Sequence, residues 1–241
     1  MIPLQRVPAP DRTQTLLRNW TTRVQNAGAT AEAARAEWKK AKYPKKHVKE
    51  LLESMAHGAV RCMYCDDSHE TDIDHFQPLA AAPLRAFVWA NHLIACAWCN
   101  SNDKRDLYPL AADGTCLLID PTVDDPADHL VLRFASCLYE GRTGKGEASI
   151  EVFGLNRPDL VQGRTRAFTT ACLVIEGWHR RYLEREPSAE DKARALLDSP
   201  FVDVVYSLTR LDPDIAETVL EEQTLPALAA WRSVYDTTPN A

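Results

Sequence analysis

Long hydrophobic runs are missing from this sequence of 241 residues. No stretch approaches the roughly 20 apolar residues that a membrane-spanning helix needs. The first residues, MIPLQRVPAPDRTQ, also lack the basic and then apolar pattern of a signal peptide. An excess of positive charge is missing too, because the formal net charge is −6, which argues against a protein that coats nucleic acid nonspecifically. We therefore expect a cytoplasmic protein without a membrane partner.

The bulk composition is that of an ordinary folded protein. Apolar residues make up 45% and charged residues 26%, near the averages for soluble globular proteins, so neither global disorder nor a fibrous repeat is expected. The length allows one sizeable domain, or a compact catalytic module with helical extensions around it.

Helical periodicity dominates both ends of the chain, which predicts helical segments at 1–57 and 156–241. In the first segment, apolar residues recur at helical spacing from Leu16 to Val24, an alanine-rich stretch ends at Pro44, and a further helix ends at Gly58. In the last segment one helical face is lined by Phe168, Ala171, Ile175, Trp178 and Tyr182, and two or three further helices are expected before Tyr235. The fold class that we predict is α+β and mostly helical.

The two middle segments differ from the ends. Residues 111–155 contain short apolar runs at 116–119, 130–132 and 149–153, separated by proline and glycine, which predicts a small β-rich segment. In residues 58–110 regular periodicity fails, and cysteine, histidine, tryptophan and asparagine are concentrated instead. This segment is the predicted chemical centre.

Four of the seven cysteines form two C-x2-C pairs, Cys62/Cys65 and Cys96/Cys99. In a reducing compartment this spacing suits metal thiolates better than disulfides. Four thiolates usually bind tetrahedral Zn²⁺, and such a site has no open position, so the predicted zinc is structural. The three remaining cysteines have apolar neighbours and are interpreted as small buried hydrophobic residues: Cys116, Cys137 and Cys172.

Residue types that suit phosphodiester hydrolysis lie between and just after the cysteine pairs. The reaction needs an activated water and a cation that neutralises charge on the phosphate. Asp74 and Asn100 offer oxygen ligands for one Mg²⁺ or Mn²⁺, and His75, on the opposite face of the strand from Asp74, is the predicted general base. His69 is a further candidate for a place beside the metal, whereas His92 is expected to pack the loop.

These residues follow a pattern: D-H-x-x-P from Asp74, then Asn91, then C-x2-C-N-x3-K ending at Lys104. The pattern resembles the zinc-knuckle branch of the HNH endonuclease family. With G-L-N-R at 154–157, it resembles the PtuB-type HNH nucleases of Septu and retron antiphage defence systems. The resemblance implies a ββα-metal module stapled by the zinc site, DNA as the substrate and a PtuA-like ATPase as the partner, docked on one of the helical ends. It also implies that Asn91 orients His75.

A basic run precedes the first cysteine pair. Residues 35–50 hold seven Lys or Arg against two Glu, a local charge of 7 − 2 = +5, for which a solvated helix face is the plain alternative. Beside a nuclease motif, we predict DNA contacts for a set of basic side chains: Lys39, Lys40, Lys42, Lys45, Lys46, Lys104 and Arg105.

Two other classes of protein stay open at this point. One is a zinc-knuckle module that binds nucleic acid or protein without catalysis, and the other is an inactive regulator bound to an ATPase. The polar residues Asp74, His75, Asn91 and Asn100 favour the enzyme, because a binding knuckle needs none of them.

Overall fold

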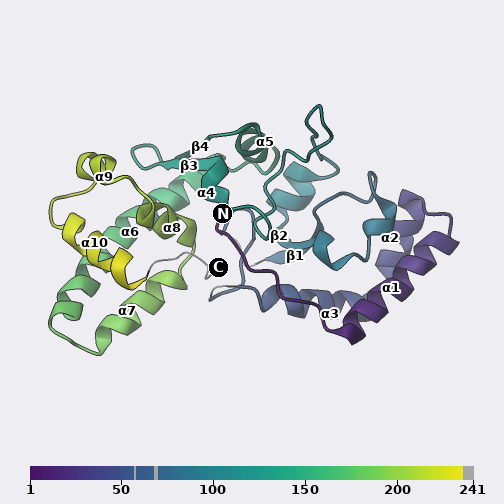
Figure 1. Ribbon diagram of the computed structural model, residues 1–241, viewed down its shortest axis with the longest axis horizontal. Coiled ribbons are helices and arrows are strands. Elements are labelled where there is room, and N and C mark those ends of the chain that lie inside the picture. The colour runs from purple at the N-terminus through teal and green to yellow at the C-terminus, as the bar shows by residue number, and fades with distance from the viewer. Residues whose placement is uncertain (57, 68–69, 236–241) are drawn as a thin grey trace.

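The computed structural model describes residues 1–56, 58–67 and 70–235. Helices gather at the two ends of the molecule, and two small antiparallel sheets lie between them (Figure 1). This arrangement confirms the predicted α+β class with mostly helical content. Within the described ranges, no helix is long and apolar enough to cross a membrane.

Three helices build the amino-terminal end: α1 (Asp11–Asn26), α2 (Ala31–Lys40) and α3 (Lys42–Glu53). Thr30 caps α2, because its side chain accepts a hydrogen bond from Ala33 N. The predicted break at Pro44 is corrected to Ala41, since Pro44 lies in the first turn of α3, where its missing N–H has no partner to lose. The helix expected to reach Gly58 ends at Glu53.

A strand hairpin followed by a helical turn forms the centre of the molecule. Strands β1 (Thr71–His75) and β2 (His92–Cys96) pair antiparallel, with His75 opposite His92. The loop between them carries two short 3₁₀ turns, η1 (Pro83–Arg85) and η2 (Trp89–Asn91). Directly after β2 comes η3 (Trp98–Lys104), a turn of π-helix. Every residue of β2 is buried, whereas β1 is buried only at Ile73 and Asp74, so β2 is the inner strand of the hairpin.

The predicted β-rich segment is only partly sheet. It holds α4 (Pro126–His129), β3 (Leu130–Arg133), β4 (Leu138–Gly141) and α5 (Gly144–Val152). The strand predicted at 130–132 is confirmed, whereas the one at 149–153 is wrong, because those residues end α5. The run at 116–119 makes one isolated bridge, between Leu110 and Cys116. Short apolar runs fit a strand or one buried helix face equally well, and Thr143, which caps α5, decides for the helix.

The carboxyl-terminal end is helical, as predicted: α6 (Pro158–Leu183), α7 (Ser188–Leu197), α8 (Val202–Thr209), α9 (Pro213–Val219) and α10 (Thr224–Val234). The predicted inner face of α6 is confirmed at Ala171, Ile175 and Trp178, which are buried, and is wrong at Tyr182, which is exposed near the end of the helix. Trp178 meets Trp231 of α10 edge to face, with 5.0 Å between ring centroids. Four helices follow α6 in the described residues, rather than two or three.

Candidate metal centre and active site

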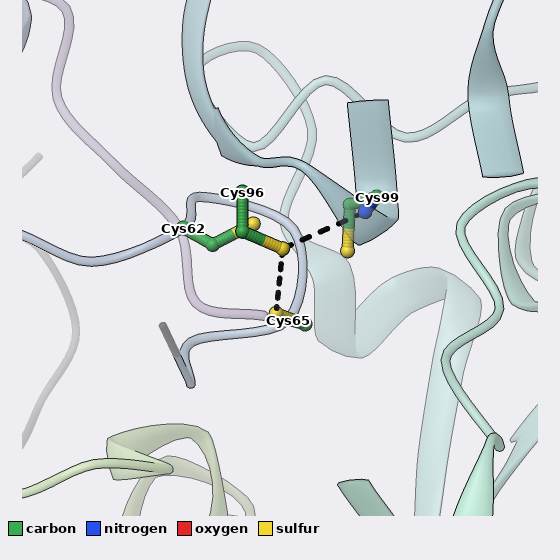
Figure 2. A group of neighbouring side chains, drawn as sticks. All are labelled: Cys62, Cys65, Cys96 and Cys99. Carbon is green, nitrogen blue, oxygen red and sulfur yellow. Dashed lines mark hydrogen bonds between the residues drawn. The ribbon is translucent and has the colours of Figure 1, made fainter. Parts of the chain in front are cut away.

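The four cysteines of the two pairs converge on one point. Cys62 and Cys65 precede β1, Cys96 ends β2, and Cys99 lies in η3. Figure 2 shows the four side chains turned toward one another, and their sulfur atoms all lie within 4.8 Å of one another. The Cys65 and Cys96 sulfurs are 3.9 Å apart, close to the about 3.8 Å that a tetrahedral site with Zn–S bonds of about 2.3 Å requires. The cluster could hold a metal ion, and its geometry fits the predicted structural zinc.

Backbone hydrogen bonds fix the first cysteine knuckle. Met63 N donates to Ile94 O at 2.9 Å, which ties the first knuckle to β2. Asp66 N donates to Cys62 O at 2.9 Å, and Asp66 takes a left-handed φ of 59° to close that turn. A hydrogen bond from Cys62 lowers the pKa of Cys65 to about 6, whereas burial raises the pKa of Cys62. Among the remaining cysteines Cys137 is buried as predicted, while Cys116 and Cys172 are half-buried.

His75 is the last residue of β1, and its ring is held by a main-chain carbonyl. Its Nε2 lies 3.0 Å from Ala86 O. A carbonyl oxygen only accepts hydrogen bonds, so the proton of the neutral ring lies on Nε2, and Nδ1 carries the lone pair. Burial lowers the pKa of His75 below its ordinary value of 6.5. The ring is therefore neutral near pH 7 and holds one nitrogen that can accept a proton.

A second histidine shares the same acceptor. His92 is fully buried, and its Nε2 also lies 3.0 Å from Ala86 O. Its ring stacks on Trp38 of α2 at 5.2 Å, and the edge of the His75 ring meets Trp38 at 4.4 Å. Trp38 and Ala86 were not predicted as site residues. Trp38 carried only the signal of a buried helix face, and a main-chain carbonyl gives no sequence signal at all.

Asp74 lies on the buried side of β1, with 3% of its surface exposed. Tyr64 Oη donates to its Oδ2 at 2.6 Å, and Lys104 Nζ donates to its Oδ1 at 3.0 Å. Lys104 also donates to His75 O at 2.7 Å. The DNA contact predicted for Lys104 is corrected, because this ammonium is fully buried and neutralises a carboxylate that would otherwise be unpaired.

The two candidate asparagines have different surroundings. Asn91 is fully buried and holds the loop backbone: its Oδ1 accepts from Gln77 N at 2.8 Å, and its Nδ2 donates to Gln77 O and Arg85 O. Asn100 is half-buried in η3, directly after Cys99. His69 lies outside the described residues.

The predicted basic contacts fall mainly on α2 and α3. Four of the lysines are exposed, namely Lys39, Lys40, Lys42 and Lys46, as is Arg105 after η3. Lys45 is half-buried, and its ammonium lies 5.5 Å from the centre of the Trp38 ring. The basic run therefore adjoins the aromatic ring that contacts His75.

The sequence of this chain is similar to the sequences of two curated proteins of the same name. A Septu protein PtuB from Bacillus mycoides (strain KBAB4) is 29% identical over 155 residues, which cover 52% of each chain. The chain resembles Septu protein PtuB. A second PtuB, from Bacillus thuringiensis, is 30% identical over 138 residues, covering 55% of this chain and 50% of its own. The chain spans about half the length of these curated PtuB relatives. No family model and no solved structure matches the sequence.

Proposed function

We propose that this chain is a metal-dependent HNH endonuclease that hydrolyses phosphodiester bonds in DNA. The observation that carries the proposal is the ring of His75, whose Nε2 is bound to Ala86 O so that Nδ1 is left as a base. The order of elements supports it, because the hairpin β1–β2 is followed at once by a helical turn that begins within the cysteine cluster. This is the strand, strand, helix order that the sequence pattern implies.

In the proposed reaction, His75 Nδ1 takes a proton from a water molecule as the water oxygen attacks phosphorus. The P–O bond to the leaving strand breaks, and the leaving oxygen takes up a proton from solvent water. The ring donates its Nε2 proton to Ala86 O throughout the reaction. This hydrogen bond fixes the orientation of the ring and keeps Nδ1 as the nitrogen that accepts the proton. Asn91 acts through the backbone, because its side chain binds Gln77, two residues after His75, and Arg85, the residue before Ala86. Asn91 is thus proposed as a positioning residue.

A divalent cation, Mg²⁺ or Mn²⁺, belongs to the proposal on chemical grounds, because it would neutralise charge on the phosphate. The two oxygen ligands predicted for it do not fit equally well. Asn100 is half-buried beside the cysteine cluster, but the carboxylate of Asp74 is buried and already paired with Lys104. With that ammonium in place, Asp74 does not fit a cation ligand, whereas the assignment of Asn100 stays a prediction.

The test is nicking of supercoiled plasmid by the purified full-length protein with Mg²⁺ or Mn²⁺, against an EDTA control. His75→Ala should lower the nicking rate by about 10²–10⁴-fold, as expected for a lost general base. His129→Ala is the matched control, because His129 ends α4 and bonds Thr143 at the start of α5, away from His75, and the change should leave nicking unchanged. Near-UV circular dichroism checks the fold of each variant. Parental nicking by His75→Ala would return the non-catalytic zinc-knuckle module to first place.

The proposed DNA surface is the basic run on α2 and α3. Lys42 and Lys46 are exposed, and Lys45 lies over the ring of Trp38, which contacts His75. Replacing Lys39, Lys42 and Lys46 by glutamine should weaken DNA binding. It should also lower the slope of log affinity against log salt by about 0.9 for each of these lysines that neutralises a phosphate. An unchanged salt slope would mean that these lysines are a solvated helix face.

We further propose a role in antiphage defence, as the effector of an ATPase partner. The support is the similarity to proteins named Septu protein PtuB. Phage plating should show protection when the chain is expressed with the proposed ATPase partner, and His75→Ala should abolish that protection. Pull-down of the ATPase by the His75→Ala protein separates loss of chemistry from loss of the partner.

A further inference from the structure

The segment Gly154-Leu155-Asn156-Arg157, between α5 and α6, is held rigidly beside the cysteine cluster. Asn156 pairs with the backbone of Tyr139 in β4, accepting from its N and donating to its O, both at 2.8 Å. Gly154 has a φ of 56°, and a Cβ there would lie 2.6 Å from a carboxylate oxygen of Asp103 in η3. The segment is therefore tied to β4 and packs closely against η3.

Arg157 uses this rigid segment to reach a cysteine sulfur. Its Nη1 lies 3.6 Å from Cys99 Sγ, 3.2 Å from Phe153 O and 3.4 Å from Gly154 O. Its Nε donates to Asp159 at 3.2 Å, and 13% of the side chain is exposed. The two carbonyls and the carboxylate orient the guanidinium, so that its approach to Cys99 is set by the fold.

The contact between Cys99 and Phe153 makes this arrangement specific. Cys99 Sγ lies 3.6 Å from Phe153 O, and a thiol could donate to that carbonyl, but a metal-bound thiolate has no proton to donate. Two electron-rich atoms would then face each other in a buried place. Because Nη1 of Arg157 contacts both atoms, it supplies the hydrogen-bond donors that the thiolate form needs.

The net charge of the zinc-loaded cysteine cluster also favours a cation beside Cys99. Four thiolates around Zn²⁺ carry a net charge of −2, and all four cysteines are buried. A buried negative charge is stabilised by a cation that donates hydrogen bonds to it. We propose that Arg157 is a positioning residue of the metal centre, which donates a hydrogen bond to the metal-bound thiolate of Cys99 and thereby slows the loss of zinc. This proposal rests on the cysteine cluster and not on the proposed nuclease function.

The test is transfer of zinc from the zinc-loaded full-length protein to a chromogenic chelator, with alkylation of each cysteine by iodoacetamide followed by mass spectrometry. Arg157→Met should speed zinc transfer by about 10–100-fold, the range found when outer-sphere partners of metal ligands are removed. Alkylation should rise selectively at Cys99, with Cys62 little changed. Arg157→Lys, which keeps the charge but not the planar fork, should lie between Arg157→Met and the parent.

Asp159→Asn is the matched control. It removes a partner of Arg157 but leaves the contact between Nη1 and Cys99 intact, so it should release zinc at the parental rate. If the role of Arg157 were purely structural, Arg157→Met and Arg157→Lys would both have a lower melting temperature, without selective alkylation of Cys99. Parental zinc transfer in Arg157→Met would overturn the proposal. If Arg157→Met does not fold, parental transfer and parental Cys99 alkylation in Arg157→Lys overturn it equally.

Discussion

Among single residues, Ala86 determines the tautomers of two histidines through its main-chain carbonyl and not through its side chain. Its carbonyl oxygen accepts from the Nε2 atoms of both His75 and His92. A carbonyl oxygen has two lone pairs, so both bonds form together and both rings adopt the same tautomer. The Nδ1 atom of His92 is buried and has no hydrogen-bond partner among the described residues, which makes protonation of that ring costly.

The surroundings of His75 predict the pH dependence of nicking. Burial lowers the pKa of His75 below 6.5, and the base must be neutral to act. The nicking rate should therefore stay level as the pH falls to about 6.5 and drop only below it. The measurement is the initial nicking rate from pH 5 to pH 8, and an inflection above pH 7 would contradict the assignment.

Stability must be followed in the same pH series. Burial lowers the pKa of His92 well below its ordinary value of 6.5, so the unfolded chain takes up a proton before the folded one does. The stability that neutral His92 supports is complete above pH 6.5 and is lost as the pH falls below it. Urea denaturation at each pH separates this loss from titration of the base.

The pair of Asp74 and Lys104 predicts a pattern of stability. Lys104→Met leaves a buried carboxylate unpaired and should cost about 3–5 kcal/mol in the free energy of unfolding, as should Asp74→Asn, which leaves the ammonium. The double variant should recover much of that loss, because neither charge remains. Urea denaturation measures all three. If the losses in the free energy of unfolding simply add in the double variant, the Asp74 carboxylate and the Lys104 ammonium do not stabilise each other.

The candidate site was predictable from sequence where the residue type carries the chemistry. The cysteine spacing predicted the cluster, which the structure shows, whereas the catalytic role given to His75 from the D-H pair stays a prediction. The acceptor of His75 could not be predicted, because it is a main-chain atom eleven residues away. The burial of Lys104 could not be predicted either, since the resemblance implied an ordinary α-helix after Cys99, where the chain forms a turn of π-helix.

Among the elements, α5 depends on a close approach at one glycine. A Cβ on Gly146 would lie 1.9 Å from His129 O, so Gly146→Ala should force α5 away from the end of α4 and cost about 1–3 kcal/mol. Gly144→Ala is the matched control, because its Cβ would meet only Leu117 at 3.9 Å. Thermal unfolding of both variants checks this. Equal melting temperatures would contradict the packing of α5.

The long elements were predictable and the short ones were not. The inner face of α6 repeats over several turns, so its periodicity is unambiguous. The run at 149–153 is too short to show whether its period is that of a strand or a helix, and the cap that decides it, Thr143, lies six residues earlier. Context from outside the run therefore fixes the structure.

For the whole molecule, the cysteine cluster lies between the two helical ends. Metal analysis should find about one zinc per chain, and Cys62→Ser or Cys99→Ser should unfold or aggregate the protein, because a structural zinc contributes on the order of 10 kcal/mol in isolated fingers. Cys172→Ser, which changes a half-buried cysteine outside the cluster, is the control. Circular dichroism and zinc content are the measurements. A soluble, zinc-free and fully active Cys99→Ser protein would exclude a structural role for the metal.

The contacts that close the first knuckle come from far along the chain. Asp66, which follows Cys65, accepts at its carboxylate from Asp203 N, 137 positions later, and at its carbonyl from Phe201 N. Arg157 reaches Cys99 from 58 positions later. On the ribosome, all four cysteines therefore emerge well before the residues that cover them. Contacts of such long sequence separation form slowly, so the nascent protein passes through a period in which its cysteine thiols are open to metal, to oxidants and to other chains.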